Sequence, residues 1–218
     1  MKKKLGCLHA HHSNIEYIEL AFRSDEDIEL VHFVDPGVLQ HVSKGSDDVA
    51  RKVKEQIEWI ISCDVDAILI TCTNYIALLE NEVVFNPPIP IIKIDEPFFE
   101  SICSVQLPQT ILFTNPATVE GTIARLRQYA KQHGKSVNVV AEVIEDTFDL
   151  IMQGEKEAYN DAILRTLHTL SDEPNLISVA QLSMVHAAQR FEEQTAWTII
   201  HPLRALVKDV KKNMAGTL

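Results

Sequence analysis

The sequence Val-Asp-Ala-Ile-Leu-Ile-Thr-Cys-Thr-Asn, at residues 65–74, decides the fold that we predict. Its first six residues form a mostly apolar, β-branched run, which is typical of a strand buried in a parallel sheet. Residues 75–82 then have a composition that continues as a helix. We therefore expect a polar tip at the carboxyl end of a strand, where open α/β folds bind their ligands. The residues of this tip are Thr71, Cys72, Thr73 and Asn74.

The start of a helix supplies N–H groups without intrahelical partners and the positive end of the helix dipole. Both favour the thiolate form of Cys72, and both can hold an anionic substrate beside it. The alternative is structural, because free cysteines are among the residue types most often buried in protein cores. The position of Cys72 and its polar neighbours favour the functional interpretation.

Length and composition indicate a globular chain. Its 218 residues suffice for one large domain or two small ones, and 46% of them are hydrophobic and 23% charged. Because no apolar run has the length of a membrane span and no signal-peptide pattern follows the first residues, we expect a cytoplasmic protein with no membrane partner. The net charge of −11 argues against nucleic acid as a partner.

The cysteines and histidines do not form a familiar metal motif. The four cysteines lack C-x-x-C spacing, so reduced thiols are favoured over disulfides or a zinc site. His9, His11 and His12 resemble a metal tract, but adjacent side chains at a strand exit diverge and no carboxylate is near in sequence. The seven glycines form no phosphate-binding loop, which disfavours nucleotides. We predict no metal and no cofactor.

Strand and helix patterns alternate along the whole chain, which favours parallel sheets flanked by helices. In the first half we expect strands at 5–8, 28–34, 65–70 and 89–94, a helix through 24 that Ser13 caps, and a helix at 47–63 that begins with Asp47 and Asp48. In the second half we expect strands at 110–113, 137–143, 176–179 and 197–200, and helices at 116–132, 154–170, 184–194 and from 201 onward.

The fold class is therefore α/β with two similar subdomains, at 1–96 and 97–218, and the last helix, 202–214, can pack back onto the first. The Cys72 tip of the first half corresponds to Val179-Ala180-Gln181-Leu182-Ser183 in the second. If the halves face each other across a pseudo-twofold axis, Cys72 and residues 181–183 flank one cleft, which we expect to be the active site.

The chain resembles the aspartate/glutamate/hydantoin racemase superfamily over nearly its whole length. The resemblance implies two similar α/β subdomains with an active site between them, often in a dimer, so we expect a homodimer. It also implies that a small carboxylate-bearing substrate is interconverted without metal or organic cofactor, by one cysteine from each half. The matching stretches are residues 30–35, 67–73, 91–97 and 179–184.

At the position of the second cysteine this chain has Gln181, which cannot titrate. Cys72 matches the first cysteine, and Thr73 and Asn74 match neighbours that bind the substrate carboxylate. The resemblance thus implies a racemase-like or isomerase-like enzyme with one thiol. A one-thiol decarboxylase or isomerase of a small dicarboxylate, and a catalytically silent binder of a small carboxylate, stay open as alternatives.

Racemisation needs a second proton carrier, and the best candidate is His201. It ends the last expected strand, and the ordinary histidine pKa of about 6.5 suits a proton donor at neutral pH. Its alternative role is to pack or cap at the strand end. Ser183 is the next catalytic candidate, and His186 and His9 are less favoured.

The remaining substrate-binding candidates follow expected strands. His9 ends the first strand, and Thr71 precedes Cys72. In the second half we expect Thr114, Asn115 and Gln181 to bind substrate, although the first two can also cap the following helix. Asp95 and Glu96 can orient a catalytic group or cap their own helix.

Overall fold

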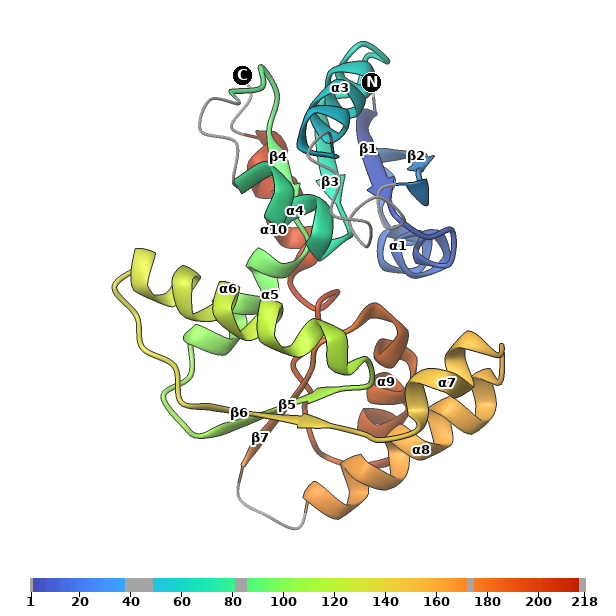
Figure 1. The fold of residues 1–218 in the computed structure, drawn as a ribbon, viewed down its shortest axis with the longest axis vertical. Coiled ribbons are helices and arrows are strands. Elements are labelled where there is room, and N and C mark those ends of the chain that lie inside the picture. The colour runs from blue at the N-terminus through green and yellow to red at the C-terminus, as the bar shows by residue number, and fades with distance from the viewer. Residues whose placement is uncertain (1, 38–48, 81–85, 172–174, 216–218) are drawn as a thin grey trace. The chain divides into compact units, whose positions relative to one another are not determined.

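The structure is a computed structural model that describes residues 2–37, 49–80, 86–171 and 175–215. The chain forms two compact units, Met1–Glu96 with Leu206–Leu218, and Pro97–Ala205. Each unit contains a parallel sheet flanked by helices (Figure 1). The α/β class with two parallel sheets, predicted from the alternation of patterns, is confirmed. Asp47 and Asp48, the predicted first residues of the helix at 47–63, lie outside the described residues.

The first unit has a four-stranded parallel sheet in the order β2-β1-β3-β4. The central strands β1 and β3 are the most buried, as expected for strands covered on both faces. The strands are β1 (Lys3–His9), β2 (Ile28–Val34), β3 (Ala67–Ile70) and β4 (Ile91–Lys93). The helices are α1 (Asn14–Phe22), α3 (Val49–Ile61), α4 (Thr73–Glu80), α5 (Asp95–Cys103), which runs into the second unit, and α10 (Leu206–Ala215).

Gly6 lets α3 approach the central strand. A Cβ atom at Gly6 would lie 3.0 Å from the Ile60 Cγ2 atom and 3.3 Å from the Val65 Cγ1 atom, so a larger residue would displace these side chains. The helical spacing that predicted α3 is confirmed, because its apolar residues are buried. They are Val49, Val53, Ile57 and Ile60.

The last helix belongs to the first unit. The ammonium group of Lys211 in α10 lies 2.6 Å from the Asp25 carboxylate, just after α1, and the Lys3 ammonium group donates to the Met214 carbonyl. The predicted start of this helix at 201 is wrong, since residues 202–205 form turns and α10 begins at Leu206.

The second unit has a three-stranded parallel sheet in the order β6-β5-β7, with apolar clusters on both faces. Ile111 of β5 joins the cluster beneath α6 and Leu112 joins the cluster beneath α8 and α9, as the alternation of a strand requires. The strands are β5 (Gln109–Phe113), β6 (Val139–Val143) and β7 (Leu176–Val179). The helices are η1 (Pro116–Thr118), α6 (Val119–Gln132), α7 (Thr147–Met152), α8 (Lys156–Leu170), η2 (Leu182–Met184) and α9 (Val185–Gln194).

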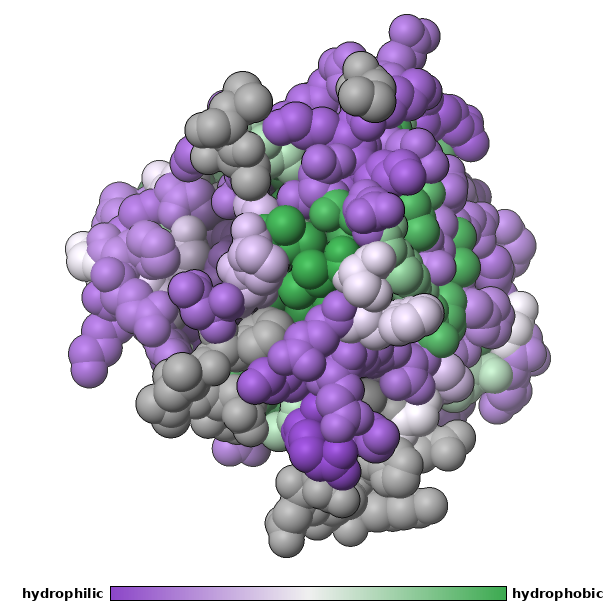
Figure 2. Space-filling model, turned by 90° about the horizontal axis from the view of Figure 1, so that it is seen from above, coloured by the Kyte–Doolittle hydropathy of each residue, from purple (hydrophilic) through white to green (hydrophobic). Residues whose placement is uncertain are grey.

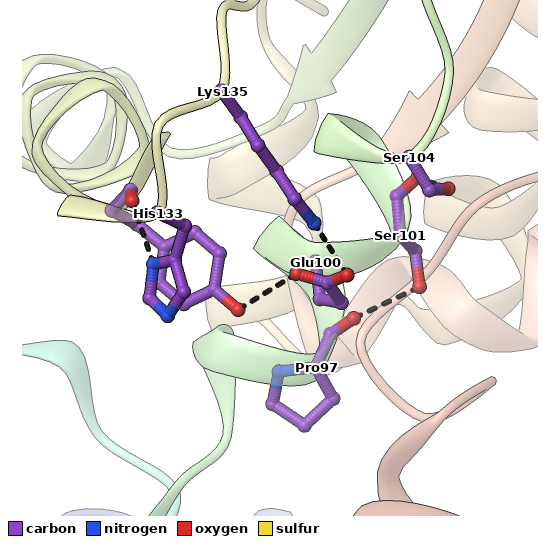
Figure 3. Close-up of polar contacts among 7 residues, drawn as sticks. Pro97, Glu100, Ser101, Ser104, His133 and Lys135 are labelled. Atoms are coloured by element: carbon purple, nitrogen blue, oxygen red, sulfur yellow. Dashed lines mark hydrogen bonds and ion pairs between the residues drawn. The ribbon is translucent and has the colours of Figure 1, made fainter. Parts of the chain in front are cut away.

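Polar contacts fasten the loop after α6 to α5. The Glu100 carboxylate accepts hydrogen bonds from the Lys135 ammonium group at 2.5 Å and from the Tyr129 hydroxyl at 3.0 Å (Figure 3). Gly134 closes α6 with a positive φ of 63°, the left-handed conformation that favours glycine at helix ends. The predicted end of this helix at His133 and Gly134 is confirmed.

Two sequence predictions fail at the level of local hydrogen bonding. The expected strand at 197–200 is wrong, because only Ile200 forms a bridge, to Ser178, while the Ile199 N–H donates to the Glu192 side chain. Ser13 precedes α1 as predicted, but its side chain accepts no helix N–H group. Its hydroxyl instead lies 2.8 Å from the His11 Nδ1 atom.

Figure 2 shows one face of the molecule, on which hydrophilic residues surround a smaller apolar area. In the described residues, no helix combines the length and apolar character needed to cross a membrane.

Candidate functional site

The polar tip of the first unit lies where the strand order of its sheet reverses, between β1 and β3. Leu8 of β1 pairs with Ile70 of β3, so His9 and Thr71 leave the sheet side by side. The Thr71 N–H donates to the Leu8 carbonyl at 3.0 Å, which extends the pairing by one residue. Reversal points of this kind are the usual ligand positions of open α/β sheets.

Cys72 stands between β3 and α4, so the predicted placement of the thiol between a strand and a helix is confirmed. Its carbonyl accepts the hydrogen bond of the Ile76 N–H at 3.2 Å, which makes Thr73 and Asn74 the first two residues of the helix. Cys72 is partly exposed, whereas Cys7 and Cys103 are buried. Cys72 therefore combines partial exposure with a position at the amino end of a helix.

His9 is fully buried, and both of its ring nitrogens have partners. Nδ1 lies 2.9 Å from the Thr71 hydroxyl, and Nε2 lies 2.8 Å from the Nδ1 atom of His32. Burial, reinforced by the charge of His32, lowers the pKa of His9 to about 4, so His9 is neutral at pH 7. His9 therefore supports Thr71 through a hydrogen bond, and its ring nitrogens are already engaged within the protein.

Two further residues extend this line of contacts, and the sequence reading missed both. The Nε2 atom of His32 lies 3.1 Å from the Glu19 carboxylate, so a chain of side chains runs from α1 to the residue before Cys72. His32 lies within the mostly apolar run of β2, where its sequence position gives no sign of a partner. Only the pairing of Cys7 with His32 across β1 and β2 brings it next to His9.

Gln181, two residues after the end of β7, is held by the tip of β5 in the second unit. Its side-chain oxygen accepts hydrogen bonds from the Thr114 N–H at 2.7 Å, the Thr114 hydroxyl at 2.7 Å and the Asn115 N–H at 3.2 Å. Backbone N–H groups can only donate, so the amide oxygen must face them. The Gln181 side chain therefore occupies the N–H groups of Thr114 and Asn115, which a bound anion would otherwise accept from.

A line of hydroxyl groups continues from Thr114 to Ser183. The Tyr159 hydroxyl lies 3.0 Å from that of Thr114 and 2.7 Å from that of Ser183. Because Thr114 donates to Gln181, the Tyr159 hydroxyl donates to Thr114 and Ser183 donates to Tyr159. The Ser183 hydrogen is thus already used. Tyr159 lies on the buried face of α8, where its sequence pattern is that of a core residue.

Asn115 has the capping role that the sequence reading had kept as its alternative. Its side-chain oxygen accepts the Ala117 N–H at 3.0 Å, which caps η1. In the first unit, Asp95 and Glu96 are the first two residues of α5, where carboxylates favour the helix dipole. The Glu96 carboxylate also lies 3.1 Å from the Lys93 ammonium group.

His201 differs from the expected proton donor. It is buried, and burial, with the charge of Arg204 adding to the effect, lowers the pKa of His201 to about 4. The ordinary histidine pKa, on which the expected role rested, therefore does not apply to His201, because its imidazole is neutral at pH 7. Within the described part of the chain, its Nδ1 atom has no hydrogen-bond partner.

No protein-family model matches the chain, and no curated protein matches its sequence. Solved structures of racemases match it over almost its full length. An aspartate racemase from Picrophilus torridus is 13% identical, with a TM-score of 0.73, over 98% of this chain and 94% of that chain. An allantoin racemase from Klebsiella pneumoniae is 20% identical, with a TM-score of 0.71, over 100% and 89%.

A glutamate racemase from Bacillus anthracis is also similar, with 12% identity and a TM-score of 0.64, over 98% of this chain and 82% of that chain. The chain therefore has the fold of the aspartate, glutamate and allantoin racemases. This agrees with the family to which the sequence resemblance pointed.

We predict that Gln181→Met lowers the free energy of unfolding by about 2 kcal/mol, because methionine leaves the Thr114 and Asn115 N–H groups without their acceptor. Urea titration measures the change. Gln194→Met, at the exposed end of α9, is the control and should change the stability by less than about 0.5 kcal/mol. Equal effects of the two substitutions would show that the Gln181 contacts are not stabilising.

We predict that stability falls with acid partly through His201. Its pKa is about 4 in the folded protein, below the ordinary value of about 6.5, so the unfolded chain takes up the proton first as the pH falls. The contribution is complete above about pH 6.5, is lost towards about pH 4, and amounts to about 2 kcal/mol between pH 7 and pH 5.

The measurement is the unfolding free energy of wild type and of His201→Leu at the two pH values. The variant should lose about 2 kcal/mol less than wild type, while replacing the exposed His12 by alanine should change nothing. If His201→Leu lost as much unfolding free energy between pH 7 and pH 5 as wild type, the His201 imidazole would not be buried in its neutral form.

Proposed function

We propose that the protein is a member of the aspartate/glutamate/hydantoin racemase superfamily that acts at the carbon next to the carboxylate of a small amino acid or related acid. Cys72 is the proton carrier, and no metal or organic cofactor takes part in this step. The observation that carries the proposal is the partly exposed thiol at the junction of β3 and α4. The shared fold with aspartate, glutamate and allantoin racemases supports the substrate class.

The chemistry follows from the surroundings of the thiol. The Cys72 thiolate removes the proton from the α-carbon, and the electron pair moves into the adjacent carboxylate as an enolate-like charge. The N–H groups of Thr73 and Asn74, at the start of α4, are the donors for that charge. Donors of this kind are worth about 3–4 kcal/mol each in the transition state.

The second unit favours a reaction that needs one thiol. Gln181 carries no titratable hydrogen and is bound by Thr114 and Asn115. Ser183 donates its hydrogen to Tyr159, and His201 is neutral at pH 7. A one-thiol decarboxylase or isomerase of a small dicarboxylate is therefore the second candidate, because a decarboxylase protonates only one face of its carbanion. The expected homodimer, the cytoplasmic location and the shared cleft stay predictions.

The test is hydrogen exchange at the α-carbon. Purified protein in deuterated water should exchange the α-hydrogen of at least one compound in a panel of single enantiomers that includes aspartate, glutamate and the hydantoin allantoin. Cys72→Ser should reduce the rate at least about a thousandfold, because a hydroxyl is a far weaker acid than a thiol. Cys63→Ser is the matched control, since Cys63 is also partly exposed and lies outside the tip.

A malonate-type acid distinguishes the second candidate, which would release carbon dioxide from it without racemising the amino acids. Thermal stabilisation by small dicarboxylates, with neither exchange nor carbon dioxide release, would contradict both enzymatic candidates and leave a silent binder. Exchange that persists in Cys72→Ser would contradict the role of the thiol.

A further inference from the structure

Four side chains of the first unit form an unbroken hydrogen-bonded line that ends at the residue before Cys72. The line runs from the Glu19 carboxylate to His32 at 3.1 Å, from His32 to His9 at 2.8 Å, and from His9 to the Thr71 hydroxyl at 2.9 Å. Its outer end meets solvent, because the Glu19 side chain is 59% exposed and that of His32 is 15% exposed. Its inner end is buried.

All hydrogen bonds of the line can be satisfied with both histidines neutral. The Thr71 hydroxyl then donates to the Nδ1 atom of His9, and the Nε2–H of His9 donates to the Nδ1 atom of His32. The Nε2–H of His32 in turn donates to the Glu19 carboxylate. In this state every donor meets one acceptor. The order of groups is that of a catalytic triad, in which a hydroxyl, an imidazole base and a carboxylate are linked by hydrogen bonds, with one additional imidazole.

The line has a second state with all hydrogen bonds satisfied, which contains one more proton. This state is possible because the Thr71 hydroxyl has a second acceptor. The Leu8 carbonyl lies 3.1 Å from the Thr71 hydroxyl oxygen. When the hydroxyl donates to that carbonyl, its oxygen accepts from the Nδ1–H of His9, and the Nε2 atom of His9 accepts from His32. His32 then carries hydrogens on both nitrogens and faces the Glu19 carboxylate as an ion pair.

We propose that Thr71, His9, His32 and Glu19 form a proton relay between the tip beside Cys72 and solvent. When the Cys72 thiol gives its proton to the Thr71 oxygen and becomes a thiolate, the hydroxyl hydrogen of Thr71 moves to the Nδ1 atom of His9. His9 passes its Nε2 hydrogen to His32, and the resulting imidazolium is held by Glu19. The reverse sequence returns the proton to the tip. His9, His32 and Glu19 are positioning residues, and their effect on catalysis rests on the proposed function of Cys72.

The geometry favours a proton over a metal ion between the two rings. The ring centres of His9 and His32 are 5.1 Å apart with their planes at 28°, and the facing nitrogens are 2.8 Å apart. The nitrogens therefore lie close to the line that joins the ring centres, as in a direct hydrogen bond. Two imidazoles on a tetrahedral ion approach it at a bent angle. Cys7, whose sulfur lies within 4.8 Å of a ring nitrogen of each histidine, would be the third ligand of such an ion.

The charged and titratable groups around His9 and His32 are compatible with both protonation states of the line. Cys7 of β1 and Glu19 of α1 are titratable side chains that lie next to His9 and His32. Burial, with the charge of Glu19 adding to it, raises the pKa of the Cys7 thiol, so Cys7 stays neutral. Glu19 therefore supplies the countercharge for the proton on His32. The Asn14 side chain also donates to the Thr71 hydroxyl oxygen at 3.3 Å, which holds that oxygen in place in both states.

The direct test is the ¹⁵N NMR spectrum of the imidazole rings of the full-length protein, from about pH 8 to about pH 5. As His32 gains its second hydrogen, His9 should move its hydrogen from Nε2 to Nδ1 while staying neutral, with the same midpoint. His12, which is exposed and lies outside the line, is the internal control and should show no coupled change of tautomer. Independent midpoints for His9 and His32, with no tautomer change at His9, would overturn the relay.

Two variants test the ends of the relay. Glu19→Gln removes the exposed countercharge and should lower the midpoint of the His9 tautomer change by about one pH unit. Glu16→Gln on the same helix is the matched control and should leave it in place. Thr71→Val removes the switching hydroxyl, so His9 should keep one tautomer throughout. An unchanged His9 response in both Glu19→Gln and Thr71→Val would contradict the proposal.

A metal measurement completes the experiment. If the purified protein holds about one equivalent of zinc, and Cys7→Ala removes it, the line is a metal site and the relay is wrong. The NMR readout needs no substrate, so the relay can fail while α-hydrogen exchange by Cys72 is intact. Equally, the tautomer change can be present in a protein that shows no exchange.

Discussion

The pairing of β1 with β3 is the constraint on which the tip of the first unit depends. The match of Leu8 with Ile70 makes the chain leave the sheet at His9 and Thr71 together. The 2.9 Å contact between these two side chains then fixes the start of the turn that carries Cys72. A shift of one residue in this register would turn each side chain of β3 to the opposite face and separate Thr71 from His9. The position of the thiol is therefore a consequence of sheet packing.

The second unit repeats this geometry with a different outcome. Thr114 follows β5 and Gln181 follows β7, and they meet at the reversal point of their sheet as His9 and Thr71 do in the first unit. The side chain that follows β7 bonds inward to the N–H groups of its own unit. Cys72, in contrast, leads into a helix and stays partly exposed. The two units thus differ at this position, because the tip of the first carries a partly exposed cysteine and the tip of the second is closed by the amide of Gln181.

The sequence predicts the parts that depend on local pattern. The alternation of apolar runs, the helical spacing of α3 and the position of Cys72 between strand and helix could all be deduced from neighbouring residues. The burial of His201 could not, because it depends on tertiary packing, and its lowered pKa follows from that burial. The expected strand at 197–200 failed for a similar reason, since the side chain of Glu192 takes the Ile199 N–H.

The same limit explains why His32, Glu19 and Tyr159 were missed. His32 and Glu19 reach His9 through the register of β2 against β1 and the packing of α1, and neither leaves a motif in the sequence. Tyr159 occupies a buried helical position like any core aromatic residue. That its hydroxyl forms hydrogen bonds with both Thr114 and Ser183 is evident only from the folded structure.

The claim that the strand-to-helix junction activates one thiol is tested most directly by comparing two cysteines of similar exposure in the same molecule. Cys72 and Cys63 are both partly exposed, and only Cys72 stands at a helix start. Mass spectrometry of protein treated with iodoacetamide at neutral pH gives the alkylation rate of each. The account predicts that Cys72 reacts at least about ten times faster than Cys63. Equal rates, or a faster reaction at Cys63, would contradict it.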